Sequence, residues 1–488
     1  MANASNDYSS FVSGNGGNIN VSLNTNGLNK VYCSYDLVYI PSTAYTPNSG
    51  ATSAGLKEFT LSGTSDKGNS FSEIDVSGSS SVTLISGVKI STDTNILEKW
   101  SFTAKYYNLD VIQDNVAGKT FKGNIKVANT NCSFNAPPRI GYEAILLDNG
   151  NGATTVDAAK AYIEGRTTST TPNFSAAATA NEGMYAKEDD YTATTGMKSY
   201  YYRGAVNNNW VQFGKDSSGK DIYWRIIRIN GDGSIRMIYS GTTAPTSSTA
   251  TVMTGTGTQI SKVAFNNSYN KAEYVGYQYI EGQQHGYGKC DGTNNASCTV
   301  NGNTVYNSTI KQAIDKWYAG TTLKDNNLVA DQIFCNDRSA SSTQTNDWAS
   351  TVITYYYGAV ERLQSNKIPI LTCPTASDKF TVNTSNGNGA LTYPVGLITA
   401  DEVAMAGGVY DGSDNNTYYL YTNQYYWLGS PIDVYYEYSY IDVSYVDYYG
   451  GVNANVVNSA NGARPVVSLS SKAKLSGNGT YSKPYTVS

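Results

Sequence analysis

Carboxylate and phenol side chains concentrate in one stretch near the end of this 488-residue chain. Residues 432–449, IDVYYEYSYIDVSYVDYY, contain seven tyrosines, three aspartates and one glutamate. Two kinds of chemistry suit such a set. Glycoside hydrolases place two carboxylates beside aromatic platforms, and Asp433/Glu437 and Asp442/Asp447 are the pairs that would serve. Alternatively, the set forms a contact surface, because a phenol ring offers a large apolar face with one hydrogen-bonding tip.

The surrounding composition favours the contact surface. No lysine or arginine occurs from residue 380 to residue 463, whereas eight acidic residues do. A buried strand would not contain an acid every few positions, because an unpaired buried charge is costly. A disordered acidic tract would not contain so many aromatic residues. An ordinary edge strand or sandwich face is the alternative that needs no ligand. We predict a binding face and no enzymatic activity.

Other catalytic chemistry finds little support in the sequence. His285 is the only histidine, in residues 282–288 (GQQHGYG), and no G-x-S-x-G elbow accompanies it. The cysteines lack the C-x-x-C spacing of metal and redox sites. The Glu-Pro-Asn and Gln-Pro-Asp triplets of calcium-dependent sugar binding are missing, so we expect binding that is independent of Ca²⁺. We predict no metal and no cofactor.

The six cysteines predict disulfides, although six allow fifteen pairings. They are Cys33, Cys132, Cys290, Cys298, Cys335 and Cys373. Cys290 and Cys298 flank a short turn-rich loop, and the pairs Cys33–Cys132 and Cys335–Cys373 would keep each bridge within one domain. Such bridges imply an oxidising compartment and stabilise by roughly 2–4 kcal/mol each. Six free thiols in a reducing cell are the alternative.

Composition limits the class of protein. The length suits two or three domains. Only 15% of the residues are charged, 40% are apolar and 46 are glycine, as in secreted, mainly β surface proteins. The net charge of −5 argues against a nucleic-acid partner. We read no signal peptide and no hydrophobic membrane segment, and therefore expect that any export leader is missing from this sequence.

The elements that must position the tyrosines are mainly strands. Residues 1–136 alternate apolar and polar positions, for example in residues 18–23, 82–85, 100–106 and 121–127, which predicts an Ig-like β-sandwich without helices. The segment NAPP at residues 135–138 marks the boundary. Residues 137–199 are expected to be a linker, with a helix over 156–164 that ends at Gly165 and an irregular stretch from 166 to 199.

Residues 200–488 predict a second, mixed α+β domain. Two strands, 222–229 and 234–239, flank the turn residues NGDG at 230–233, which is a strong hairpin signal. The clearest helix spans residues 308–318, because Ile310, Ile314 and Trp317 share one face and Ser308 is a suitable cap. Residues 425–431 and 461–469, on the two sides of the tyrosine-rich stretch, are expected to be core strands.

Several segments of this domain resemble a known family. They are WVQF at 210–213, residues 223–236, FCNDR at 334–338, YWLGS at 426–430, GARPVVSL at 462–469 and residues 477–485. Together they are similar to C-type-lectin-like domains of the formylglycine-generating-enzyme type, which serve as variable proteins of diversity-generating retroelements. Residues 105–123 resemble stalk domains of Gram-positive surface and pilus-type proteins.

The resemblance implies which residues vary. In such proteins, adenine-directed mutagenesis changes surface positions between fixed core strands, and here the variable region would span about residues 425–465. The fixed inward residues would be Ile441, Val443, Val446, Val452 and Val457. The outward, ligand-binding set would be Asp433, Tyr435, Tyr436, Glu437, Tyr438, Tyr440, Asp442, Ser444, Tyr445, Asp447, Tyr448, Tyr449, Asn453, Asn455 and Asn458. The family also includes enzymes with cysteine chemistry, for which Cys335 and Cys373 are the nearest candidates, but buried thiols or a disulfide are expected there.

The sequence therefore predicts a hypervariable adhesin or receptor on a bacterial surface or a phage particle. Its partner would be a protein or glycan on another cell surface, without direct membrane insertion. A carbohydrate-active enzyme and a purely structural fibre or pilus subunit are the alternatives.

Overall fold

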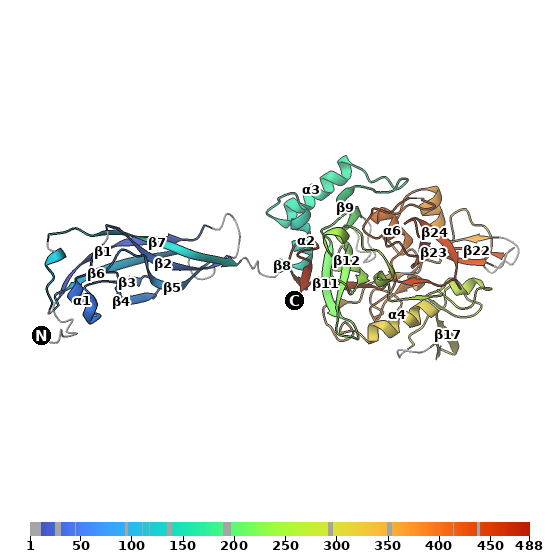
Figure 1. Ribbon diagram of the computed structural model, residues 1–488. Helices are drawn as coiled ribbons and strands as arrows, with labels where there is room; N and C mark the ends of the chain where they lie inside the picture. Colours follow the sequence, from blue (N-terminus) through green and yellow to red (C-terminus); the bar gives the residue numbers. More distant parts are fainter. Residues whose placement is uncertain are drawn as a thin grey trace. The chain divides into compact units, whose positions relative to one another are not determined.

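The computed structural model describes residues 11–24, 31–43, 45–92, 96–109, 111–116, 118–133, 139–188, 197–290, 296–348, 354–412, 414–436 and 440–488. The chain divides into two compact units, Met1–Pro137 and Pro138–Ser488 (Figure 1). Each unit is built mainly from strands, so the predicted mainly β class with a few helices is confirmed. No helix among these residues is long and apolar enough to span a bilayer.

Two antiparallel sheets face each other in the described part of the first unit. Their strand orders are β1-β6-β3-β4 and β5-β2-β7. Tyr35 and Leu37 of one sheet share a core with Trp100 and Phe102 of the other, which makes a sandwich. The elements are β1 (Phe11–Ser22), β2 (Tyr32–Thr43), α1 (Ser49–Ala54), β3 (Phe59–Ser65), β4 (Ser70–Asp75), β5 (Val82–Ser91), β6 (Leu97–Tyr107), η1 (Asp114–Val116) and β7 (Lys122–Ser133). The short helix α1 was not expected from the sequence.

The disulfide of the first unit lies within a sheet. Cys33 on β2 and Cys132 on β7 are direct cross-strand partners and are bonded to each other. In antibody domains the bridge instead connects the two sheets. This disulfide therefore ties two neighbouring strands together and departs from the antibody pattern.

The second unit contains many short strands. In chain order, and within the described residues, they are β8 (Arg139–Ile140), β9 (Asn181–Lys187), β10 (Ser199–Gly204), β11 (Trp210–Lys215), β12 (Asp221–Ile229), β13 (Ile235–Gly241), β14 (Ser261–Val263), β15 (Gln278–Tyr279), β16 (Ser297–Val300), β17 (Asn303–Asn307), β18 (Val329–Ala330), β19 (Phe334–Cys335), β20 (Tyr355–Tyr356), β21 (Lys379–Phe380), β22 (Tyr426–Tyr435), β23 (Tyr440–Val446), β24 (Val452–Val456), β25 (Asn461–Ala463), β26 (Val466–Leu469), β27 (Lys474–Ser476) and β28 (Tyr485–Val487). The α-helices are α2 (Gly141–Asn149), α3 (Val156–Ser169), α4 (Thr309–Ala319), α5 (Gly358–Val360) and α6 (Ala400–Ala406).

Residues 137–199, expected to be a linker, belong largely to the second unit. Strand β8 pairs with β27, and β9 pairs with β10, so this segment contributes to the main sheet. Helices α2 and α3 bury Ile145 and Ile163 in the core of the unit. Helix α3 also continues past Gly165 to Ser169, because a glycine inside a helix weakens it but does not by itself end it. The expected linker and helix end were therefore wrong.

The predicted hairpin and helix of the second domain are confirmed. Strands β12 and β13 pair antiparallel around the turn at residues 230–233, where the Asn230 N–H donates to the Ser234 carbonyl at 2.8 Å. Helix α4 begins after Ser308, whose hydroxyl accepts a hydrogen bond from the Lys311 N–H. Ile310 and Ile314 are fully buried, and both belong to the same core as Trp427.

Buried ion pairs connect α6 to the main sheet. The Glu402 carboxylate lies 3.0 Å from Arg228 Nε and 2.6 Å from Arg236 Nε, and all three side chains are at most 1% exposed. Glu402 also closes a capping box with Thr399 at the start of α6. Burial alone would raise the pKa of Glu402, but the Arg236 and Arg228 guanidinium groups outweigh it and lower that pKa. One carboxylate thus fixes the helix and is the shared counter-ion of two buried cations.

Candidate ligand-binding surface

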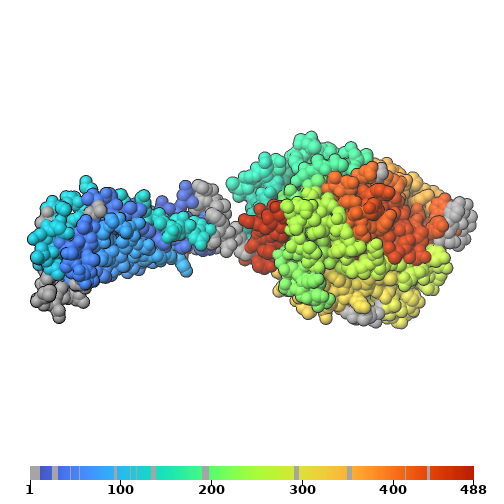
Figure 2. Space-filling model, in the orientation of Figure 1, coloured from blue at the N-terminus to red at the C-terminus, as the bar shows by residue number. Residues whose placement is uncertain are grey.

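The tyrosine-rich stretch folds into the hairpin β22–β23 and continues into β24. In Figure 1, β22, β23 and β24 are labelled together in the orange and red part of the second unit, and in Figure 2 orange-red atoms of this segment reach the visible surface. Strand β22 also pairs with β20, so the stretch lies inside a sheet of order β14-β25-β22-β23-β24 among the described residues. Ile441, Val443, Val446, Val452 and Val457 are at most 2% exposed, as predicted for the inward set.

The remaining side chains divide between the two faces of this sheet. Strands β23 and β24 pair without interruption from Asp442–Val456 to Val446–Val452. Successive side chains of a regular strand point to opposite faces. Asp442 and Tyr445 therefore lie on opposite faces, and the single contact surface expected from the sequence is two surfaces.

The first of these, here called the acidic surface, consists of Tyr356, Asp433, Tyr435, Tyr440 and Asp442. Asp433 is the cross-strand partner of Asp442, Tyr435 is the partner of Tyr440, and Tyr356 is the partner of Asp433 on its other side. Tyr440 is 49% exposed. Sequence reasoning paired Asp433 with Glu437 and Asp442 with Asp447, and it missed the facing pair Asp433–Asp442. It also missed Tyr356, for which the run of three tyrosines at 355–357 was the only signal in the sequence.

Burial changes the acid strength of the facing aspartates. It raises the pKa of Asp433 to about 7, with a further contribution from the Asp442 charge. It also raises the pKa of Asp442 to about 6. Each side chain has one buried oxygen, Oδ1, without a hydrogen-bond partner among the described residues. Near neutral pH this pair therefore holds protons that an exposed pair would release.

The second surface, here called the aromatic surface, consists of Tyr425, Tyr445, Tyr448 and Tyr449. The Tyr425 ring lies 5.7 Å from the Tyr445 ring and 6.4 Å from the Tyr448 ring, centroid to centroid. Tyr448 also meets Tyr449 edge to face at 5.6 Å. Tyr425 was expected to be part of the core flank but is 42% exposed, so that expectation was wrong for this residue, whereas Tyr426, Trp427 and Leu428 are fully buried as predicted.

Several residues of the predicted outward set hold the scaffold together instead. The Asp447 carboxylate accepts hydrogen bonds from the N–H groups of Tyr449 and Gly451, both at 2.9 Å, and so fixes the turn before β24. The Tyr436 hydroxyl donates to the Trp348 carbonyl at 2.9 Å. The Asn453 and Asn455 side chains each accept a hydrogen bond from the next backbone N–H. Asn458, in contrast, is exposed. Glu437 and Tyr438 lie outside the described residues.

Ser444 contradicts the prediction that it faces outward. It is fully buried, and its hydroxyl donates to the Ser430 carbonyl at 2.7 Å. The reason is an irregularity in β22: between the pairs Trp427–Tyr445 and Pro431–Val443, β22 has three residues where β23 has only Ser444. A small hydroxyl side chain satisfies the carbonyl that this bulge leaves unpaired.

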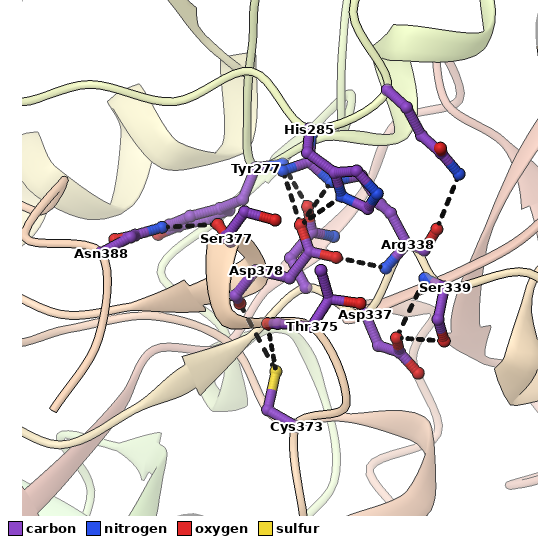
Figure 3. A network of polar contacts seen from close by, with 12 residues as sticks. Tyr277, His285, Asp337, Arg338, Ser339, Cys373, Thr375, Ser377, Asp378 and Asn388 are labelled. Atoms are coloured by element: carbon purple, nitrogen blue, oxygen red, sulfur yellow. Dashed lines mark hydrogen bonds and ion pairs between the residues drawn. The ribbon is translucent and has the colours of Figure 1, made fainter.

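His285 belongs to a different network, which is shown in Figure 3. Its Nδ1 atom lies 3.1 Å from Oδ1 of the buried Asp378, toward which Arg338 also points. Arg338 contributes contacts from Nε at 2.9 Å and Nη2 at 2.8 Å to the same oxygen. Burial would raise the pKa of Asp378, but Arg338 and His285 outweigh it and lower that pKa. The carboxylate is thus already neutralised by an arginine.

The cysteines near this network are bonded. Cys335–Cys373 is a disulfide, as are Cys290–Cys298 and Cys33–Cys132, and the described residues include no free cysteine. The three predicted pairings are confirmed, and no thiol of Cys335 or Cys373 is available as a nucleophile. Among the described residues no group of three or more His, Cys, Asp or Glu side chains is placed to hold a metal ion. Cavities of about 450, 420 and 410 Å³ are lined by other segments of the chain.

Comparisons with protein-family models, curated proteins and solved structures gave no match for this chain.

Proposed function

We propose that this chain is a ligand-binding surface protein of the adhesin or receptor type. Its second unit would be a C-type-lectin-like head, and its first unit an Ig-like stalk. The observation that supports this most directly is the group of tyrosines on the β22–β24 region that point into solvent: Tyr425, Tyr440, Tyr448 and Tyr449 are 42%, 49%, 45% and 57% exposed. Single exposed rings are common on folded proteins, but Tyr425, Tyr448 and Tyr449 lie beside one another, and a contiguous exposed apolar patch favours an interaction site.

The two surfaces offer enough area for recognition. One engaged tyrosine removes about 150–250 Å² from water, so four or five would supply much of a half-interface of ~800 Å². Tyrosine loses little conformational entropy on binding, because it has few rotatable bonds. The absence of lysine and arginine from residue 380 to 463 favours a partner with a basic rim, and such charges contribute to specificity more than to affinity.

The head would be a target of a diversity-generating retroelement. On this proposal, variation falls on exposed positions such as Tyr440, Tyr448, Tyr449 and Asn458, and spares the buried Ser444 and the five inward aliphatic residues. Sequencing the locus in related isolates tests it, together with a search for a near-copy of the 3′ coding end beside a reverse-transcriptase gene. Substitutions spread evenly over the head would contradict the proposal.

A carbohydrate-active enzyme is the second candidate, because Asp433 and Asp442 face each other with raised pKa values beside tyrosines. Incubation with a polysaccharide panel and assay of reducing ends separates the two functions. Release of sugar that Asp433→Asn and Asp442→Asn both abolish would favour the enzyme. A purely structural fibre subunit predicts neither hydrolysis nor tyrosine-dependent binding.

The binding proposal is tested with two matched variants on a glycan array and on panels of intact bacterial and animal cells. The first changes Tyr425, Tyr440, Tyr448 and Tyr449 to serine. The control changes four tyrosines of similar exposure elsewhere in the head, namely Tyr162, Tyr269, Tyr287 and Tyr481, to serine.

We expect the control to keep the targets of the natural chain and the first variant to lose at least about tenfold in affinity, since one tenfold step is only about 1.4 kcal/mol. Addition of EDTA should leave binding unchanged. Equal binding by both variants would refute the proposal.

A further inference from the structure

The facing aspartates of the acidic surface are held close by the backbone. Asp433 and Asp442 are direct antiparallel partners, and such partners place their Cβ atoms about 4.5–5.5 Å apart on the same face. Their Oδ1 atoms are shielded from solvent and unpartnered among the described residues. As long as the hairpin is folded, this backbone pairing keeps the two carboxyl groups close together.

The groups around this pair offer no compensating cation among the described residues. On one side Asp433 faces Tyr356 of β20, and on the other side Asp442 faces Val456 of β24. The titratable groups that share this environment are Tyr356, Tyr410, Asp411, Tyr435 and Tyr440, and Tyr445 lies on the opposite face of the sheet. They are phenols and one more acid, and burial raises the pKa of Tyr356, Tyr410 and Tyr445 further above neutrality.

Two ionised carboxylates at this distance repel each other, whereas a carboxyl and a carboxylate can share a proton. Burial already raises the pKa of Asp433 to about 7 and that of Asp442 to about 6. Both values lie above the ordinary aspartate value of about 4 that applies to the unfolded chain. The folded hairpin thus binds protons more tightly than the unfolded chain.

We propose that Asp433 and Asp442 form a proton-operated switch of the β22–β23 hairpin. With at least one of them protonated the hairpin is closed, and with both ionised it opens at the Tyr435–Tyr440 end. The stabilisation is fully present below the unfolded pKa near 4 and is lost as the pH rises through about 6 to 7. The switch would regulate the surface to which we assign binding, and in this respect it rests on the proposed function. The test of the switch uses no ligand, so the switch and the binding function can each fail independently.

Hydrogen exchange of the full chain, read by mass spectrometry over residues 426–446 and corrected for the intrinsic pH dependence, measures the opening. Protection at about pH 8 should be at least tenfold lower than at about pH 5 in the natural chain, because both pKa values are raised by more than one unit and one unit corresponds to tenfold in an equilibrium. Asp433→Asn and Asp442→Asn should each reduce this difference, and the double substitution should reduce it to less than about twofold, because burial alone keeps the pKa raised at the aspartate that a single substitution leaves in place. Asp411→Asn, which changes an exposed acid next to Tyr410, should keep the full difference.

A carboxyl NMR titration of the natural chain gives a second reading that does not depend on how the variants fold. The assigned Asp433 and Asp442 signals should titrate above about pH 5.5, as the raised pKa values require, and the Asp433 signal should titrate lower in Asp442→Asn. Titration of both signals near pH 4 would overturn the proposal, and so would a loss of the protection difference in Asp411→Asn equal to that in Asp433→Asn.

Discussion

At the scale of single residues, substitutions of buried charged and hydroxyl side chains in the second unit should cost more stability than substitutions of its exposed tyrosines. Glu402 and Ser444 each satisfy groups that no neighbouring water could reach, because both side chains are at most 1% exposed. A buried group that loses its partner costs the full desolvation of the group left behind. Substitutions at these two positions therefore distinguish scaffold from surface.

Glu402→Gln should destabilise the head by about 3–5 kcal/mol, because two buried guanidinium groups would lose their counter-charge. Chemical denaturation measures this change. Glu281→Gln is the matched control: its ion pair with Lys271 is roughly half exposed and should contribute less than about 1 kcal/mol. Since the pKa of Glu402 is lowered in the folded chain, its contribution is present above the unfolded pKa near 4 and is lost as the pH falls through the folded value. Equal effects of the two substitutions would contradict this account.

Ser444→Tyr should destabilise by about 1–3 kcal/mol or more, although tyrosine is the commonest residue of the stretch 432–449. The β22 bulge leaves no space for a ring, and the Ser430 carbonyl would lose its donor. Ser444→Ala should cost only about 1 kcal/mol for the lost hydrogen bond. Tyr440→Ser, at an exposed site on the same strand, should change thermal stability little. A well-tolerated Ser444→Tyr would show that the bulge can adapt.

At the scale of elements, hydrogen bonds, a disulfide and ion pairs fix short segments that have little regular structure. Strand β19 pairs with β21 over two residue pairs, and the Cys335–Cys373 disulfide reinforces this short contact. The ion pair between Asp378, directly before β21, and Arg338, shortly after β19, also joins these two segments. Such elements are too short to persist through backbone hydrogen bonds alone.

Peptide mapping without reduction should recover the three pairs Cys33–Cys132, Cys290–Cys298 and Cys335–Cys373. Replacing Cys335 and Cys373 together by alanine should lower the free energy of unfolding by about 2–4 kcal/mol. Without the bridge, the loop between the two positions is open in the unfolded chain, which gains conformational entropy. The Cys290–Cys298 bridge encloses a much shorter loop and should contribute less. Recovery of any other pairing would refute the assignment.

At the scale of the whole molecule, each unit has a core of its own. The buried core residues of the first unit all precede residue 110, and those of the large core in the second unit all follow residue 141. Helices α2 and α3 belong to the second core, through Ile145 and Ile163 among others. The unit that folds is therefore longer than the domain of residues 200–488 expected from the sequence.

A fragment of residues 138–488 should melt cooperatively, whereas a fragment of residues 200–488 should aggregate or lose cooperativity. The shorter fragment exposes the core surface that α2, α3 and β9 cover, and each buried side chain of this size contributes about 1.5–3 kcal/mol. Circular dichroism melting and size-exclusion chromatography measure the difference. Equal melting of the two fragments would show that residues 138–199 are dispensable.

The sequence alone determined features that depend on local chemistry. Period-two alternation predicted the sandwich strands, NGDG predicted the β12–β13 hairpin, and Ser308 with its apolar stripe predicted α4. A short loop suggested the pairing Cys290–Cys298 and domain membership suggested the other two, but only the structure decided among the fifteen possibilities. The inward aliphatic residues followed from their types. Apart from the cysteine pairings, these features are decided by neighbours in the chain or by the tendency of apolar side chains to avoid water.

Only the tertiary structure decided how the tyrosine-rich stretch is used. Tyr356 reaches Asp433 from 77 positions away because β20 pairs with β22. Asp433 faces Asp442, and Ser444 turns inward, because a bulge in β22 sets the register of the hairpin. A shift of one residue moves a side chain to the other face of a sheet. Strand register depends on contacts between distant segments, so residue types alone could not assign these side chains to a face.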